Sequence, residues 1–143
     1  MPIILLRHGS AGSQETWHGD DTLRPLDGLG QDQARALVDG LALYGIVRIM
    51  SSPHARCVET VEPLAARLEL PIEERDELAD GAPVTGALAL LEEVDGDGVV
   101  LVCTHRSVIT DLIGPERPCR KGGAWILEAT PDGFAPAVYL QEP

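Results

Sequence analysis

A short apolar run near the start of the chain, residues 3–6, ends abruptly in Arg7, His8 and Gly9. Such a run is typical of a buried parallel strand, and open α/β sheets bind ligands at the carboxyl ends of such strands. At that edge an arginine can clamp an anion and a glycine lets the backbone approach it, while a histidine can serve as base, ligand or nucleophile. The feature predicts an α/β sheet with a polar site at one edge.

Two later segments repeat the pattern. A second aliphatic run, residues 99–102, leads to His105, and a third run, residues 46–50, leads into a helical segment that carries Arg56. Because the carboxyl ends of parallel strands share one crevice, the two arginines and two histidines of these segments are expected to converge. Histidines surrounded by arginines are typical of a phosphate-binding pocket that contains a nucleophile.

The rest of the chain alternates helical and extended patterns. Asp27 is expected to cap a helix that ends near residues 44–45, and Pro63 is expected to kink or split a helix over residues 54–68. The remaining expected elements are an extended piece from residue 71, helices over residues 85–94 and 107–113, a strand over 99–104, and hairpin strands over 124–129 and 134–140. This alternation predicts a single three-layer α/β/α domain over residues 1–143 with a largely parallel central sheet.

The motifs together resemble the histidine phosphatase superfamily, also called the phosphoglycerate-mutase-like family. Residues 7–9 resemble its signature triplet, the stretch from Ser52 through Arg56 to Thr60 its second arginine motif, and His105 its second histidine. The short length resembles the SixA-like phosphohistidine phosphatases. Residues 19–21, 24–27 and 120–122 resemble the phosphatase domain that some bacteria fuse behind a Nudix hydrolase domain.

The resemblance implies a role for each of these residues. His8 is the expected nucleophile, whose neutral imidazole attacks phosphorus and forms a phosphoenzyme. Arg7 and Arg56 are expected to hold the non-bridging phosphoryl oxygens, and His105 is expected to donate to the same group. Gly9 is expected to let the backbone approach the anion.

The proton donor for the leaving group is left open among several carboxylates. Family members often supply it from the loop after the third strand, which here contains Glu77, the first choice, and Asp80, the second. Asp20 and Asp21, in the long loop after the first strand, are a third choice. A good leaving group needs no donor.

The charge pattern restricts the partners. The chain has 11 basic and 23 acidic residues, a net charge of −12, and an acidic surface repels nucleic acid and anionic membranes. Several of the cations nevertheless fall in or beside the motifs, and a basic cleft within an acidic surface attracts small phosphorylated anions. Arg120 and the chain's only lysine, Lys121, are expected to bind the second and third phosphates of a nucleotide. The alternative for this pair is a solvated turn.

Other site types are disfavoured. The three cysteines form no C-x-x-C motif, and His18 and His54 lack partners at metal-ligand spacing, so neither a metal nor another cofactor is expected. Cysteine phosphatase chemistry at Cys103 needs an arginine six positions later, where Ile109 stands. No apolar run approaches the roughly 20 residues of a membrane span, and no signal peptide is evident, so a cytoplasmic location is expected.

Three functions follow in order of preference. The first is a metal-independent phosphatase that acts through phosphorylated His8 on a small phosphorylated molecule, with nucleotides among the candidates. The second is a SixA-like phosphatase for phosphohistidine on proteins. The third is a non-catalytic module that binds phosphate or a partner protein on the same fold.

Overall fold

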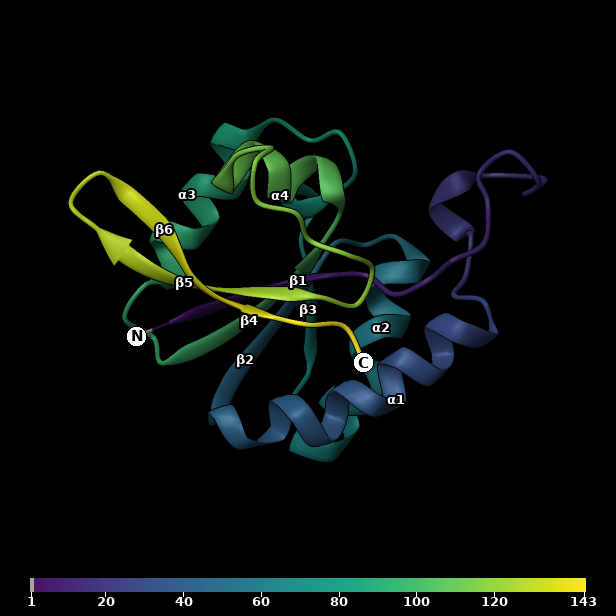
Figure 1. Cartoon of the computed structure of the whole chain (residues 1–143), viewed down its shortest axis with the longest axis horizontal. Coiled ribbons are helices and arrows are strands. Elements are labelled where there is room, and N and C mark those ends of the chain that lie inside the picture. The colour runs from purple at the N-terminus through teal and green to yellow at the C-terminus, as the bar shows by residue number, and fades with distance from the viewer. Residues whose placement is uncertain (1) are drawn as a thin grey trace.

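The computed structural model describes residues 2–143 and forms one mixed sheet with the strand order β3-β2-β4-β1-β5-β6 (Figure 1). The strands are β1 (Ile3–Arg7), β2 (Ile46–Ser51), β3 (Ile72–Glu74), β4 (Val99–Thr104), β5 (Ala124–Thr130) and β6 (Gly133–Leu140). The α-helices are α1 (Gly28–Leu41), α2 (Ala55–Leu68), α3 (Val84–Val94) and α4 (Arg106–Ile113). Short 3-10 helices are η1 (Asp21–Leu23), η2 (Ala42–Tyr44) and η3 (Asp76–Leu78).

Parallel pairing joins the strands that position the site. β1 pairs with β4, β4 with β2 and β2 with β3, all in parallel, whereas β5 is antiparallel to both β1 and β6. The last pairs of the two central ladders are Arg7 with Thr104 and Ser51 with Cys103, so β1, β4 and β2 end level with one another. The predicted α/β class with a largely parallel sheet is confirmed, and the predicted strands end at one edge.

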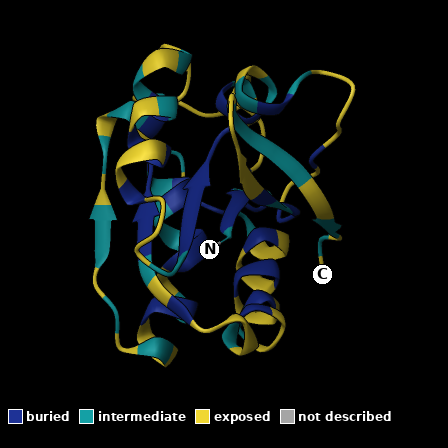
Figure 2. Ribbon diagram, turned by 90° about the vertical axis from the view of Figure 1, so that its left-hand side faces the viewer, coloured by how far each residue is buried: buried dark blue, intermediate teal, exposed yellow. Residues whose placement is uncertain are grey.

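Two aliphatic cores lie on the two faces of the sheet. Because side chains alternate along a strand, Ile3 and Leu5 of β1 pack toward α3 and α4, whereas Ile4 and Leu6 pack toward α1 and α2. Figure 1 shows these helix pairs on opposite sides of the sheet, and Figure 2 shows the buried strands between helices whose outer faces are exposed. The result is the predicted three-layer arrangement.

Of the kink or split expected at Pro63, the split does not occur, and the kink stays a prediction. Helix α2 continues from Ala55 to Leu68 with Pro63 inside it. A proline in a helix interior costs about 3 kcal/mol. Val61 and Leu64, on either side of the proline, are fully buried in the core beneath the sheet, and burying such side chains stabilises by about 1.5–3 kcal/mol each. This packing explains why the helix is continuous.

The predicted helix cap is confirmed and also fixes the loop after β1. The Asp27 carboxylate accepts from the backbone N–H of Gly30 at 2.8 Å, and the same side chain accepts from the Ser10 hydroxyl at 2.7 Å and from Gly12 N–H at 3.0 Å. These bonds tie the start of α1 to the loop that follows His8. Within residues 2–143, no helix combines the length and apolar character needed to cross a membrane.

Candidate active site

A cavity of about 260 Å³ opens at the edge where β1, β2 and β4 end; we call it the His8 cavity. The residues that line it are Arg7, His8, Gly12, Gln14, Arg24, Arg56, Asp80, His105, Arg106, Ser107 and Lys121. It brings together both arginines and both histidines that the sequence places at strand ends. Each comes from a different element: Arg7 ends β1, His8 follows it, Arg56 lies in the first turn of α2, and His105 precedes α4.

The His8 ring is held with one nitrogen available. Its Nδ1 lies 2.8 Å from the carbonyl oxygen of Gly9. Since a carbonyl can only accept, Nδ1 carries the hydrogen and Nε2 keeps its lone pair. Burial, the main cause, together with the nearby guanidinium of Arg56 and against the raising effect of the Gly9 carbonyl, lowers the pKa of His8 to about 4. At neutral pH His8 is therefore an uncharged imidazole, the form that can act as a nucleophile.

His105 is held through its Nε2. Its Nε2 lies 2.8 Å from the hydroxyl of Ser52, and that hydroxyl already accepts from the backbone N–H of His54 at 3.2 Å. A hydroxyl has two acceptor lone pairs, so Ser52 can donate to Nε2 or accept from it, and both tautomers of His105 fit this contact. Burial lowers the pKa of His105 to about 3, and the ring centroid is 5.3 Å from that of His8. His105 is therefore a neutral imidazole beside the nucleophile.

Arg56 is held in place by acidic neighbours. Its side chain is only 2% exposed; its Nη1 donates to the backbone oxygen of Asp21 at 2.9 Å, and its Nη2 lies 3.2 Å from the Asp21 carboxylate. The same Nη2 lies 3.6 Å from the Asp80 carboxylate. Asp21 also pairs with Arg24 at 3.0 Å. Arg7 is held differently, because its Nη1 donates to the backbone oxygen of Cys119 at 3.0 Å.

Several buried nitrogens around the cavity have no hydrogen-bond partner. Within residues 2–143, four buried side-chain atoms lack a hydrogen-bond partner: Arg7 Nε, Arg56 Nε, His105 Nδ1 and His54 Nδ1. The first three belong to residues that line the His8 cavity, and the His54 ring packs edge-on against His105 at 4.6 Å between centroids. A buried unsatisfied donor or acceptor costs about 1–3 kcal/mol. A group of three, two of them on guanidinium ions, indicates a site built for an anion.

Gly9 has a different setting from the one expected. It does not line the cavity: its N–H donates to the Thr60 hydroxyl at 2.9 Å, and that hydroxyl donates to the Arg56 carbonyl at 2.6 Å. A Cβ on Gly9 would lie 3.1 Å from Gln33 Oε1 and 3.3 Å from the Gly30 carbonyl oxygen. Gly9 thus allows the loop after β1 to pack closely between α1 and α2, beside the nucleophile.

The two carboxylates expected in the loop after the third strand differ in whether they line the His8 cavity. Glu77 lies in η3, pairs with Arg75 at 2.7 Å and does not line the His8 cavity. Asp80 does line it, and its Oδ1 accepts from the Ser107 hydroxyl at 2.7 Å. Partial burial raises the pKa of Asp80, but the Ser107 hydrogen bond, His105 and Arg56 together lower it overall. Of the two, Asp80 is the carboxylate at the cavity.

The other expected acids and cations are also separated. Asp20 caps η1 through Thr22 N–H at 2.9 Å, and neither Asp20 nor Asp21 lines the cavity. Lys121 lines the His8 cavity, whereas Arg120 lines a neighbouring cavity. Sequence reasoning counted Arg24 and Arg106 among the cations of a basic cleft, with a surface position as the alternative for Arg106, but it did not place Ser107 or Gln14 in the site. The available signal was adjacency, because residues 106–107 directly follow His105 in the chain.

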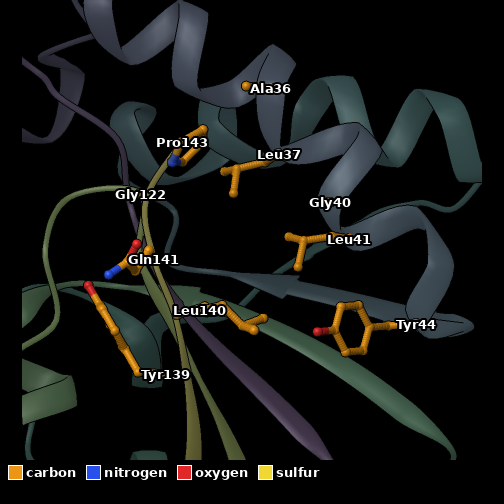
Figure 3. A pocket seen from close by; sticks show the side chains of 11 residues that line it. Ala36, Leu37, Gly40, Leu41, Tyr44, Gly122, Tyr139, Leu140, Gln141 and Pro143 are labelled. Carbon is orange, nitrogen blue, oxygen red and sulfur yellow. The ribbon is translucent and has the colours of Figure 1, made fainter.

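A larger cavity, about 400 Å³, lies elsewhere. Figure 3 shows it between α1 and the C-terminal end of β6, with Leu37, Leu41, Tyr44 and Leu140 around it. None of the side chains that line it carries a charge at neutral pH. Neither cavity suggests a metal, since within residues 2–143 no three His, Cys, Asp or Glu side chains gather into a group able to hold one.

The buried histidines make a testable contribution to pH stability. An unfolded histidine titrates near pH 6.5, whereas folded His8 titrates near 4, so below pH 6.5 the unfolded chain binds protons that the folded chain does not. Stability present above pH 6.5 is thus lost as the pH falls toward 4.

Replacing His8 with asparagine should make the protein less sensitive to acid. The unfolding free energy of the wild type falls between about pH 7 and 5, and we expect this fall to be about 1–2 kcal/mol smaller in His8→Asn. Urea denaturation measures this, and His18→Asn, at an exposed histidine, is the control. Equal losses in wild type and His8→Asn would mean that folded His8 titrates normally.

Two bacterial phosphatases are similar to this chain in sequence. The chain is 34% identical over 155 aligned residues to an 8-oxo-(d)GTP phosphatase of Mycolicibacterium smegmatis; the alignment covers 99% of this chain but only 48% of the relative. The chain thus spans about half the length of that protein. It is also 26% identical to a phosphohistidine phosphatase SixA homolog of Haemophilus influenzae, with 99% of this chain and 100% of the relative covered.

The fold has solved counterparts. The structure of the protein histidine phosphatase SixA complexed with tungstate superposes with a TM-score of 0.80 at 23% identity, covering 99% of this chain and 97% of that one. The family model for the histidine phosphatase superfamily (branch 1) matches residues 3–83, more than half of the chain, including β1, His8 and Arg56. The chain belongs to the histidine phosphatase superfamily.

Proposed function

We propose that the chain is a phosphatase that transfers the phosphoryl group of a small phosphorylated substrate first to His8 and then to water. The observation that carries this proposal is the set of three buried nitrogens without a partner, Arg7 Nε, Arg56 Nε and His105 Nδ1, around a neutral His8 with a free Nε2. A phosphoryl group in the His8 cavity gives the two guanidinium donors an acceptor, and it accepts from His105 in the tautomer that carries the hydrogen on Nδ1. The guanidinium ions then offset the charge that spreads over the phosphoryl oxygens during transfer.

The reaction proceeds in two displacements. In the first, a bond forms between His8 Nε2 and phosphorus while the bond from phosphorus to the leaving oxygen breaks, and the leaving group departs with the electron pair. In the second, water attacks the phosphohistidine, releases phosphate and restores the neutral imidazole. We assign proton transfer to Asp80, which serves as acid for the leaving group and as base for the water.

The lowered pKa of Asp80 has a consequence for the leaving group. In the free protein this carboxyl is mostly ionised at neutral pH, so it is ready to act as base for the water and acts as acid for the leaving group only through its small protonated fraction. Substrates whose leaving groups need little protonation, such as phosphoanhydrides and aryl phosphates, suit the site better than alkyl phosphates. The similarity to an 8-oxo-(d)GTP phosphatase favours a nucleotide, and the similarity to a SixA homolog favours phosphohistidine on a protein as the second candidate.

A substrate panel tests the proposal. Purified protein without added metal is given 4-nitrophenyl phosphate, nucleotides, an alkyl phosphate and a phosphohistidine protein, with phosphate release as the readout. We expect turnover that vanadate inhibits, with nucleotides or the aryl ester preferred over the alkyl ester. Binding of phosphate without turnover of any of these compounds would contradict the phosphatase and leave a non-catalytic module.

The assignment of Asp80 leads to a separate prediction. Asp80→Asn is expected to lower turnover of an alkyl phosphate about 10²–10⁴-fold, the usual contribution of a general acid or base. The first-turnover release of 4-nitrophenol should change far less, because that leaving group needs no proton. The comparison is with Glu77→Gln, which removes the other candidate carboxylate. If Glu77→Gln caused the larger loss on the alkyl ester, Glu77 would be the proton donor.

A further inference from the structure

A second cavity adjoins the His8 cavity. It has a volume of about 230 Å³, and four arginines line it: Arg7, Arg106, Arg117 and Arg120. Arg7 and Arg106 also line the His8 cavity, so the two spaces meet at these side chains. We call this space the second cavity.

The charge in the second cavity is mostly uncompensated. Among residues 2–143, no carboxylate pairs with Arg106 or Arg120, and the ion pair of Arg117 is with Glu116 at 2.7 Å. Arg7 also lacks a carboxylate partner within the same residues, and besides burial, the main cause, the positive charge of Arg106 contributes to the lowered pKa of Arg7. In a chain with 23 acidic and 11 basic residues, four arginines around one small space are unusual. Mutual repulsion among them is relieved by an anion placed between them.

The segment that carries Arg117 and Arg120 is anchored to β1. The Cys119 carbonyl accepts from Arg7 Nη1 at 3.0 Å, and the Gly123 carbonyl accepts from the Arg7 backbone N–H at 2.9 Å. The backbone N–H of Arg120 donates to the Tyr139 hydroxyl at 3.0 Å, and that hydroxyl donates to Glu142 at 3.2 Å. The backbone of Arg120 is thereby fixed relative to His8, and the residue lines the second cavity.

We propose that the second cavity binds a further phosphate of the substrate while the reacting phosphate occupies the His8 cavity. The substrate class is therefore a compound with a terminal phosphoanhydride, such as a nucleoside diphosphate. This inference rests on the proposed function and adds the site that selects the substrate. Arg117 and Arg120 are specificity-determining residues, because they line the second cavity and not the His8 cavity.

The chemistry of such a substrate suits both cavities. His8 Nε2 bonds to the terminal phosphorus, the bridging P–O bond breaks, and the inner phosphate leaves with the electron pair of that bond. The arginines of the second cavity stabilise the negative charge on this leaving phosphate, so no proton donor is needed for the first step. Water then releases phosphate from His8, with Asp80 accepting the proton. The balance gives inorganic phosphate and a compound shorter by one phosphate.

Binding of inorganic pyrophosphate and inorganic phosphate, measured by calorimetry, tests the second cavity without requiring turnover. We expect the wild type to bind pyrophosphate at least about 10-fold more tightly than phosphate, since each charged hydrogen bond contributes about this factor or more. Arg117→Ala with Arg120→Ala should remove that preference and leave phosphate binding within about 3-fold. The control, Arg35→Ala with Arg67→Ala, removes the same charge from exposed helix positions and should keep the preference.

The outcomes separate the two proposals. The proposal of a second phosphate site would be overturned if the Arg117→Ala, Arg120→Ala protein kept the preference for pyrophosphate. It would also be overturned if the wild type showed no such preference. Equally weakened binding of pyrophosphate and phosphate in the double variant would overturn the division into two sites. The single Arg120→Gln variant checks this result with a smaller perturbation. Turnover of 4-nitrophenyl phosphate is assayed on the same proteins. Its absence in the wild type would count against the phosphatase, whereas normal turnover with no pyrophosphate preference would count against the second cavity alone.

Discussion

Replacing His8 with alanine is expected to lower phosphatase turnover by more than about 10³-fold, as loss of the nucleophile does in enzymes that form covalent intermediates. The fold should remain, because the hydrogen bond that the His8 side chain makes is to the adjacent carbonyl of Gly9. Because the buried His8 ring has a lowered pKa, His8→Ala also removes a contribution that makes the folded protein less stable in acid. Steady-state kinetics measures the turnover, and thermal unfolding of the same preparation measures the stability.

The matched control is His18→Ala, which removes an exposed histidine from the loop after β1. Its turnover should equal that of the wild type. Wild-type activity in folded His8→Ala would contradict the phosphohistidine mechanism, because the reaction would then proceed without His8 as the nucleophile.

Arg56→Lys is expected to lower kcat/KM about 10²–10³-fold and to weaken phosphate binding, although the positive charge remains. A lysine has neither the fork that holds Asp21 nor an Nε donor directed separately into the site. Oxyanion-stabilising donors contribute factors of this size. The comparison variant is Arg48→Lys, which alters a partly exposed arginine paired with Glu73 at 2.8 Å.

Kinetics and phosphate calorimetry on both variants give the readout, with thermal unfolding to confirm that each is folded. Activity of Arg56→Lys within about 3-fold of the wild type would mean that charge alone suffices. The role assigned to the Arg56 fork would then be wrong.

The parts of the fold that the sequence predicts are those with a strong local signal. β1 and β4 are buried on both faces, so they appear as continuous apolar runs, and the polar residues after them mark the sheet edge. The strand ends then bring His8 and His105 together, because parallel strands in register end level. The Asp27 cap is predictable for the same reason, since the residue acts on a backbone group three positions away.

The parts that were not predictable depend on contacts between distant segments. Pro63 is a helix breaker in isolation, and only the buried neighbours on both sides show that α2 continues. The choice between Glu77 and Asp80 depends on the η3 turn and on pairing with Arg75, which sequence spacing does not reveal. The separation of Arg120 from Lys121 into two cavities likewise depends on how the loop before β5 is tied to β1.

The most direct test of the central claim is to trap the phosphoenzyme. Wild type and Asp80→Asn protein are mixed with 4-nitrophenyl phosphate, quenched in base within the first turnover, digested and analysed by mass spectrometry. The mechanism predicts one phosphorylated histidine, at His8, that is stable in base and lost in acid, with more accumulating in Asp80→Asn, where the attacking water lacks its base. Phosphate found on Cys103 or His105, or rapid turnover with no phosphorylated residue at any quench time, would contradict it.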